Sequence, residues 1–164
     1  MDEAIHHDYL IALGSNRRHH LVGSPARVLA AALIALAAED IDVLAASPLV
    51  TTRPIGPSRR SYINGAAVIR CGLWPDELLT LLKHIEASFG ARRGQRWAAR
   101  TLDLDIILWS GGRWQSRAPD LVVPHRLFRE RGFVLGPARV VAPGWRDPCT
   151  RLTIRQLHTR LTRA

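Results

Sequence analysis

Two aspartates separated by one residue are the feature of this chain that most directly suggests chemistry. Asp103 and Asp105 lie in the run Arg100-Thr101-Leu102-Asp103-Leu104-Asp105-Ile106-Ile107-Leu108, whose alternation predicts a β-strand. Successive strand side chains point to opposite faces, so the carboxylates share one face, roughly 7 Å apart, and the apolar residues 102, 104, 106 and 108 share the other. Such a pair suits one or two divalent cations, and oxygen ligands favour magnesium and phosphate chemistry. The alternative is a solvated edge strand whose aspartates only discourage aggregation.

The composition predicts a single globular domain over residues 1–164. With 164 residues, 47% of them hydrophobic, the chain can bury one full core. Its first residues are acidic and lack an apolar stretch, and the longest apolar run, residues 28–38, is too short to span a bilayer. We therefore expect a cytoplasmic monomer with no membrane partner. Cys71 and Cys149 are expected to be reduced thiols, one of them in the core.

The net charge of +9 raises nucleic acid as a partner. Only Lys83 among the 23 basic residues is a lysine, and this arginine bias, together with abundant alanine, is typical of a coding bias. Carboxylates on a central strand would also repel a phosphate backbone. We therefore expect no nucleic-acid partner, and regard a basic nucleic-acid-binding protein as the weakest alternative.

The order of the predicted elements indicates an α+β fold. In chain order they are a strand over 9–13 that stops at a turn formed by residues 14–16, a helix from Pro25 capped by Ser24, strands over 41–52 and 61–71, a helix from Pro75 to Gly90, and the aspartate strand. This β-α-β-β-α-β order is that of a ferredoxin-like sandwich, with an antiparallel sheet and two helices on one face. The other face is then free to carry a site. A C-terminal extension follows, extended over 121–125, looped over 126–133 and helical over 154–161.

Six blocks of residues, in order from about residue 9 to residue 143, resemble the 6-hydroxymethyl-7,8-dihydropterin pyrophosphokinase family of folate biosynthesis. They are Leu13-Gly14-Ser15-Asn16; Thr52-x-Pro54-Ile55-Gly56; Tyr62-Ile63-Asn64; Glu86; Arg96-Trp97-x-x-Arg100-Thr101-Leu102-Asp103-Leu104-Asp105; and Pro124-His125 with Arg131-Gly132-Phe133-Val134-Leu135. The resemblance implies a ferredoxin-like fold and a diphosphotransferase activity. The terminal diphosphate of ATP, the co-substrate, would be transferred to the hydroxymethyl group of the reduced pterin, releasing AMP.

The resemblance also implies roles for individual residues. Asp103 and Asp105 would hold two Mg²⁺ ions and act in catalysis together with Arg92 and Arg93 of a basic loop over residues 91–99 and with Arg100, which follows it. The reduced pterin would contact Thr52, Pro54, Ile55, Tyr62, Asn64, Trp97 and Phe133. ATP would contact Lys83, Glu86, Trp97, Arg100, Ile106, His125, Arg126 and Arg131.

The basic loop departs from the family pattern. Ala98-Ala99 stands where the family commonly has Gly-Pro, and alanine has neither the freedom of glycine nor the fixed φ of proline. Which of Arg92 and Arg93 serves as the loop arginine stays open. The alternative function is therefore a catalytically silent relative that binds pterin or nucleotide.

Overall fold

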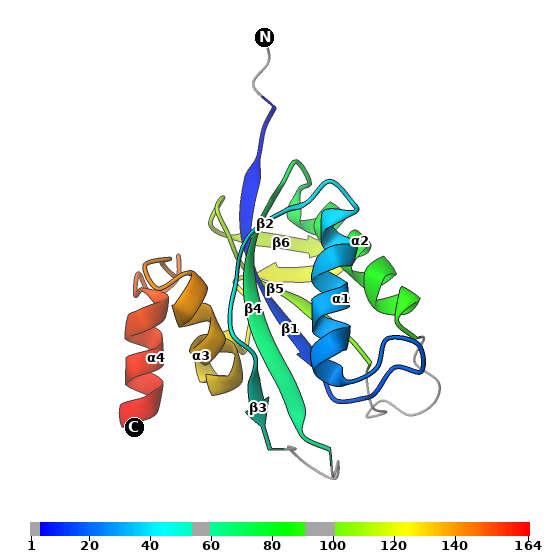
Figure 1. Ribbon diagram of the computed structural model, residues 1–164. Coiled ribbons are helices and arrows are strands. Elements are labelled where there is room, and N and C mark those ends of the chain that lie inside the picture. The colour runs from blue at the N-terminus through cyan, green and yellow to red at the C-terminus, as the bar shows by residue number, and fades with distance from the viewer. Residues whose placement is uncertain (1–3, 54–59, 91–100) are drawn as a thin grey trace.

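The structure is a computed structural model that describes residues 4–53, 60–90 and 101–164. Its elements are β1 (His7–Ser15), α1 (Pro25–Ala37), β2 (Asp42–Ala46), β3 (Val50–Thr52), β4 (Tyr62–Cys71), α2 (Pro75–Ser88), β5 (Asp103–Trp109), β6 (Trp114–Arg117), β7 (Asp120–Val123), the 3₁₀ turn η1 (Phe128–Glu130), α3 (Gly132–Val141) and α4 (Ile154–Arg163). Within the described residues a five-stranded antiparallel sheet has the order β2-β4-β1-β5, with β3 also paired to β4. This confirms the predicted ferredoxin-like arrangement. Figure 1 shows the sheet between α1 and α2 on one side and α3 and α4 on the other.

The helices α1 and α2 cover the first face of the sheet, as predicted. Ser24 caps α1, its Oγ accepting a hydrogen bond from the Arg27 amide at 3.4 Å, and Pro25 begins the helix. Apolar residues at helical spacing, such as Val28, Leu36, Leu78 and Leu82, are buried against the strands. The first core lies between these two layers.

The second face was expected to be open, and that prediction is wrong for its central part. Buried residues of α3 and α4, Leu135 and Leu157 among them, pack with Leu10, Val68 and Ile107 in a second core. The helix α3 was also missed, because Gly132, Gly136 and Pro137 lie inside it. Glycine and proline have low helix propensity, so the local sequence does not predict a helix there. The open part of this face is therefore confined to the end of the sheet beyond Leu10 and Ala66.

Two strand boundaries and one pairing register also differ from the prediction. The single strand expected over 41–52 is divided into β2 and β3 at residues 47–49, where Pro48 has no amide hydrogen to donate. Gly14 and Ser15 continue β1 rather than forming a turn. In β5 the pairing register shifts by one residue near Ile107, so Leu108 packs in the second core and not with Leu104 and Ile106 in the first.

Two smaller expectations can be compared with the structure. Cys71 is buried, Cys149 is exposed and both are free thiols, as predicted. Among the described residues, no helix has the length and apolar character needed to cross a membrane.

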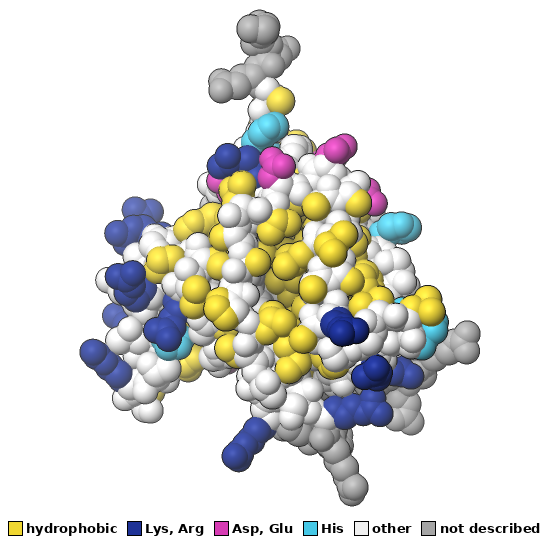
Figure 2. All heavy atoms as spheres, in the orientation of Figure 1, with side chains coloured by type: hydrophobic (Ala, Val, Ile, Leu, Met, Phe, Trp, Pro, Cys, Tyr) yellow, Lys and Arg dark blue, Asp and Glu magenta, His cyan; other side chains and the backbone are white. Residues whose placement is uncertain are grey.

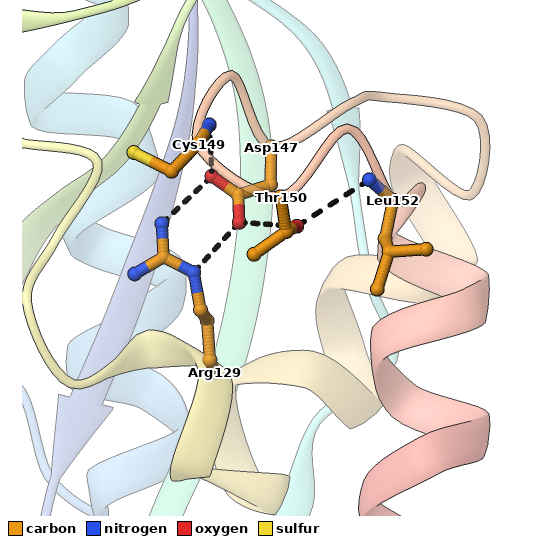
Figure 3. Close-up of polar contacts among 5 residues, drawn as sticks. All are labelled: Arg129, Asp147, Cys149, Thr150 and Leu152. Carbon is orange, nitrogen blue, oxygen red and sulfur yellow. Dashed lines mark hydrogen bonds and ion pairs between the residues drawn. The ribbon is translucent and has the colours of Figure 1, made fainter.

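An ion pair between a partly buried arginine and a buried aspartate joins η1 to the loop between α3 and α4 (Figure 3). Arg129 donates from Nε and Nη2 to the Asp147 carboxylate at 2.6 and 2.7 Å. The same carboxylate accepts from the Thr150 hydroxyl at 2.7 Å and from the Cys149 amide at 3.0 Å, and Asp147 is 0% exposed. Burial raises the pKa of Asp147, but the bonds from Arg129, Thr150 and Cys149 outweigh it, and the pKa is about 2.

This low pKa predicts a loss of stability in acid. Asp147 releases its proton more readily in the folded chain than in the unfolded chain, so its contribution is complete above about pH 4 and is lost as the pH falls towards about 2. The contribution is about 2 kcal/mol of unfolding free energy. Urea unfolding of the wild type and of Asp147→Asn across this range should show a shallower acid dependence in the variant. Parallel curves would contradict the assignment.

Candidate active site

The predicted aspartates lie at the open end of the second face. They belong to two neighbouring rungs, a rung being a row of residues paired across adjacent strands. Gly14 of β1 pairs with Asn64 of β4 on one side and with Asp103 of β5 on the other. In the next rung Ala12 lies between Ala66 and Asp105. Because neighbouring strands are about 4.8 Å apart, Asn64 and Asp103 flank a gap roughly 10 Å wide. The sheet thus presents an amide and two half-buried carboxylates around a floor of glycine and alanine.

Glu86 holds the free edge of the aspartate strand. Its Oε1 accepts the Leu104 amide hydrogen at 2.8 Å, between the two aspartates in sequence, and Lys83 pairs with the same carboxylate at 3.1 Å. Burial raises the pKa of Glu86; the Leu104 amide and Lys83 oppose this shift, and Asp103 adds to it. Glu86 is predicted to contact ATP, and the structure shows it accepting the hydrogen bond of an edge-strand amide, that of Leu104.

Three of the predicted pterin residues that the structure describes, Thr52, Tyr62 and Asn64, lie together where β3 pairs with β4. The Asn64 side chain is 6% exposed, and its Nδ2 donates to the Thr52 hydroxyl at 2.8 Å. Tyr62 lies two residues before Asn64 and therefore on the same face of β4. Phe133, the other predicted aromatic, begins α3 and is half-buried against the second core.

The predicted ATP residues His125 and Arg131 flank η1 and approach the site from the C-terminal layer. The His125 amide donates to the Ile107 carbonyl of β5 at 3.0 Å, which brings the imidazole towards Asp105. Arg131 caps α3, with its guanidinium 5.6 Å from the centre of the Phe133 ring. The segment therefore places an imidazole and a guanidinium on the side of the site that carries the aspartates.

The imidazole of His125 is neutral and offers a donor. Burial lowers its pKa, Asp105 raises it and Arg131 lowers it, with a net lowering. Its Nδ1 accepts the Leu127 amide hydrogen at 3.2 Å, so the single ring proton lies on Nε2. That N–H can donate to an anionic oxygen without His125 being charged.

Other predicted site residues are placed differently or lie outside the described ranges. Lys83 and Arg126 are exposed. The side chain of Ile106 is 2% exposed in the first core, on the face opposite the aspartates, so only its backbone is near the site. Six predicted residues lie outside the described residues: Pro54, Ile55, Arg92, Arg93, Trp97 and Arg100.

Basic side chains gather at the same end of the sheet. Figure 2 shows Lys and Arg side chains at the lower end and along the C-terminal helices, with Asp and Glu at the upper end. Exposed arginines follow β1 at positions 17 and 18, follow β3 at 53 and precede β4 at 60. A positive potential at this end favours an anionic ligand over a neutral one.

The small residues of the floor were not predicted as site residues. Along β1 one face carries Leu10, Ala12 and Gly14, so the side chains shorten towards the open end. A Cβ atom on Gly14 would lie 3.2 Å from Asn64 Oδ1 and 3.9 Å from Asp103 Cβ. The decreasing size along one face was the sequence signal for this floor of small residues.

A methyl group added at Gly14 should weaken binding of the pterin, the ligand that the sequence predicts for this site. The φ angle of Gly14 is not in the left-handed region, so Gly14→Ala should fold normally and act only through the space it occupies. We expect the KM for the pterin to rise about tenfold, as for one misfitting methyl group in a binding pocket. Gly136→Ala is the control, because a Cβ there meets nothing within 4 Å. Equal kinetics for both variants would show that Gly14 does not line the site.

The aspartate pair fits a magnesium site that is completed by a substrate. Among the described residues no three His, Cys, Asp or Glu side chains are grouped as a closed metal site. Magnesium needs no such group, since proteins commonly hold it by one or two carboxylates, with phosphate oxygens and water as the other ligands. The donors at Asp103 and Asp105 therefore suit a metal that arrives with a polyphosphate.

Sequence comparisons point to one family. The family model described as 7,8-dihydro-6-hydroxymethylpterin-pyrophosphokinase matches residues 10–143. A 2-amino-4-hydroxy-6-hydroxymethyldihydropteridine pyrophosphokinase of Synechocystis sp. is 38% identical over 151 residues, which cover 92% of this chain and 74% of the relative. One from Pseudomonas aeruginosa is 39% identical over 140 residues, covering 84% and 82%.

Comparison with solved structures supports the fold. The crystal structure of wild-type Plasmodium falciparum HPPK-DHPS with SDX-DHP aligns with a TM-score of 0.71 and 12% identity, over 98% of this chain. The aligned region is 45% of that longer chain, so this chain spans less than half of it. At such low identity the likeness bears on the fold alone.

Proposed function

The chain belongs to the 7,8-dihydro-6-hydroxymethylpterin-pyrophosphokinase family, and from this premise we propose how its residues divide the work of the family's reaction. The activity is ATP-dependent transfer of a diphosphate group to the hydroxymethyl group of the reduced pterin, in folate biosynthesis. The observation that carries the residue assignment is the row of paired residues in which Asn64 and Asp103 flank Gly14. One ligand can lie over this floor between an amide and the carboxylates.

The bond changes define what the site must do. The hydroxymethyl oxygen bonds to the β-phosphorus of ATP, the bond from that phosphorus to the oxygen bridging the α- and β-phosphates breaks, and AMP leaves. The hydroxyl proton is lost to solvent. Such transfers are catalysed mainly by alignment of the reacting groups and by stabilisation of charge on the phosphoryl oxygens.

Asp103 and Asp105 hold magnesium for this reaction. When bound, magnesium neutralises negative charge on the triphosphate and helps to align it. The strand geometry keeps both carboxylates on one face, and the bond from Leu104 to Glu86 holds the strand edge. Both features position the aspartates, and among the residues that the structure describes no third His, Cys, Asp or Glu side chain joins them.

Asn64 and Thr52 bind the pterin edge. An asparagine amide offers both a donor and an acceptor to an amide-like heterocycle. The bond from Asn64 Nδ2 to the Thr52 hydroxyl fixes the orientation of the amide, with Nδ2 towards Thr52. Its Oδ1 then lies over Gly14. Tyr62 and Phe133 supply aromatic faces for stacking.

His125 and Arg131 bind the phosphates of ATP. The neutral imidazole donates from Nε2, and the guanidinium of Arg131 offers paired donors to phosphate oxygens. Their approach from the C-terminal layer sets them on the aspartate side of the floor. The arginines at the same end of the sheet attract the anionic nucleotide (Figure 2).

We also propose a cytoplasmic monomer, which gel filtration and cell fractionation would test.

Formation of a pterin diphosphate distinguishes an active enzyme from a relative that binds pterin without catalysis. The purified chain is incubated with ATP, magnesium and 6-hydroxymethyl-7,8-dihydropterin, and the pterin is analysed by mass spectrometry. A pterin diphosphate supports the proposal. Unmodified pterin, in a sample where calorimetry shows that pterin binds, would favour the catalytically silent binding protein. The sequence Ala98-Ala99, where the family commonly has Gly-Pro, is the reason to keep that alternative.

A further inference from the structure

The segment that carries His125 and Arg131 is one short hydrogen-bonded unit. The Phe128 amide donates to the His125 carbonyl at 3.4 Å, the Glu130 amide to the Leu127 carbonyl at 3.2 Å, and the Arg131 amide to the Phe128 carbonyl at 3.3 Å. At its first residue the unit is tied to β5, through the bond from His125 to Ile107. Any displacement of its middle is therefore transmitted to His125 and Arg131.

Arg129, in the middle of this unit, is tied to Asp147 on the opposite side (Figure 3). The pair is bidentate, and the guanidinium also lies 4.7 Å from the centre of the Phe128 ring. Asp147 is itself fixed, because its amide donates to the Leu152 carbonyl at 2.9 Å and its carbonyl accepts from the Arg151 amide at 2.8 Å. The buried carboxylate is thus a rigid anchor for η1.

We propose that Arg129 and Asp147 are positioning residues for ATP. They hold η1 against the C-terminal layer so that His125 and Arg131 face Asp105. This inference rests on the proposed function in one respect, which is that His125 and Arg131 contact the nucleotide. Neither Arg129 nor Asp147 touches the substrate, so their effect on catalysis passes through the two residues that they place.

If Arg129 and Asp147 position the nucleotide residues, their loss should change the binding of ATP but not of the pterin. A purely structural role would change neither. In Asp147→Asn and Arg129→Met we expect the KM for ATP to rise about tenfold, as for phosphate contacts displaced by less than 1 Å. The KM for the pterin should stay unchanged. Arg129→Lys keeps the charge and one hydrogen bond, so its KM for ATP should lie between those of the wild type and Arg129→Met. Calorimetry with a non-hydrolysable ATP analogue should show the same order of affinities.

Two controls account for lost stability. Arg70→Met removes a second bidentate pair, Arg70 with Asp8 at 2.6 and 2.9 Å, at the opposite end of β1. Leu36→Ala opens a cavity in the first core, where Leu36 is 0% exposed. Both should lower the melting temperature without changing the KM for ATP, with all rates measured well below unfolding.

Three outcomes are informative. A selective rise in the KM for ATP, graded through Arg129→Lys, supports the inference. Lower melting temperatures with an unchanged KM for ATP in Asp147→Asn and Arg129→Met would overturn it and leave a purely structural ion pair. If the wild type forms no pterin diphosphate, the proposed function fails, and the affinities for the ATP analogue still decide whether the pair positions the nucleotide residues.

Discussion

Replacing Asp103 or Asp105 with asparagine is expected to lower the turnover number about a thousandfold while the chain stays folded. The substitutions keep the size and shape of the side chains but remove the negative charge that a magnesium ion requires. Both aspartates are half-buried at the open end of the sheet. Removing one of two neighbouring carboxylates should therefore leave the melting temperature unchanged or slightly higher.

The measurement is pterin-dependent AMP release, with calorimetric titration of the pterin alongside it. Pterin binding should persist in both variants, because Asn64 and Thr52 lie across the floor from Asp103. Asp120→Asn, at an exposed position that begins β7, is the matched control and should be fully active. Wild-type rates in either Asp103→Asn or Asp105→Asn would refute the role of the aspartate pair.

Replacing Asn64 with alanine is expected to raise the KM for the pterin about a hundredfold, with a smaller change in the KM for ATP. A site built to hydrogen-bond its ligand loses about 1–3 kcal/mol for each buried partner that is removed. Asn64 is almost fully buried beside the floor, and its loss also leaves the Thr52 hydroxyl without its partner. Steady-state kinetics with each substrate varied in turn will measure both constants.

Variants of Thr52 test whether the orientation of the Asn64 amide matters. Thr52→Ser keeps the hydroxyl that accepts from Nδ2, and should retain most pterin affinity. Thr52→Val has the same shape without the hydroxyl, so the amide of Asn64 is released and affinity should fall. If both variants bind pterin like the wild type, the hydrogen bond at 2.8 Å does not orient the site.

The parts of the fold that the sequence predicted were those with strong local signals. The stripes of α1 and α2 and the cap at Ser24 are local patterns, and both helices form where expected. The shared face of Asp103 and Asp105 follows from strand geometry alone. The two-residue spacing of Tyr62 and Asn64 likewise placed both on one face of β4.

The parts that were missed depend on tertiary contacts. The helix α3 contains two glycines and a proline and is held by packing in the second core, which no local pattern reveals. The register shift that turns Leu108 to the second core arises from the pairing of β1 with β5. Arg129 and Asp147 are 18 residues apart in sequence, so nothing in either local segment indicates their pairing.

The most direct test of the central claim is AMP release from ATP and magnesium, with and without 6-hydroxymethyl-7,8-dihydropterin. Transfer of a diphosphate group leaves AMP, whereas transfer of a single phosphoryl group leaves ADP. We expect one AMP for each pterin consumed and negligible nucleotide turnover without pterin. ADP as the product, or AMP release that does not depend on the pterin, would contradict the account.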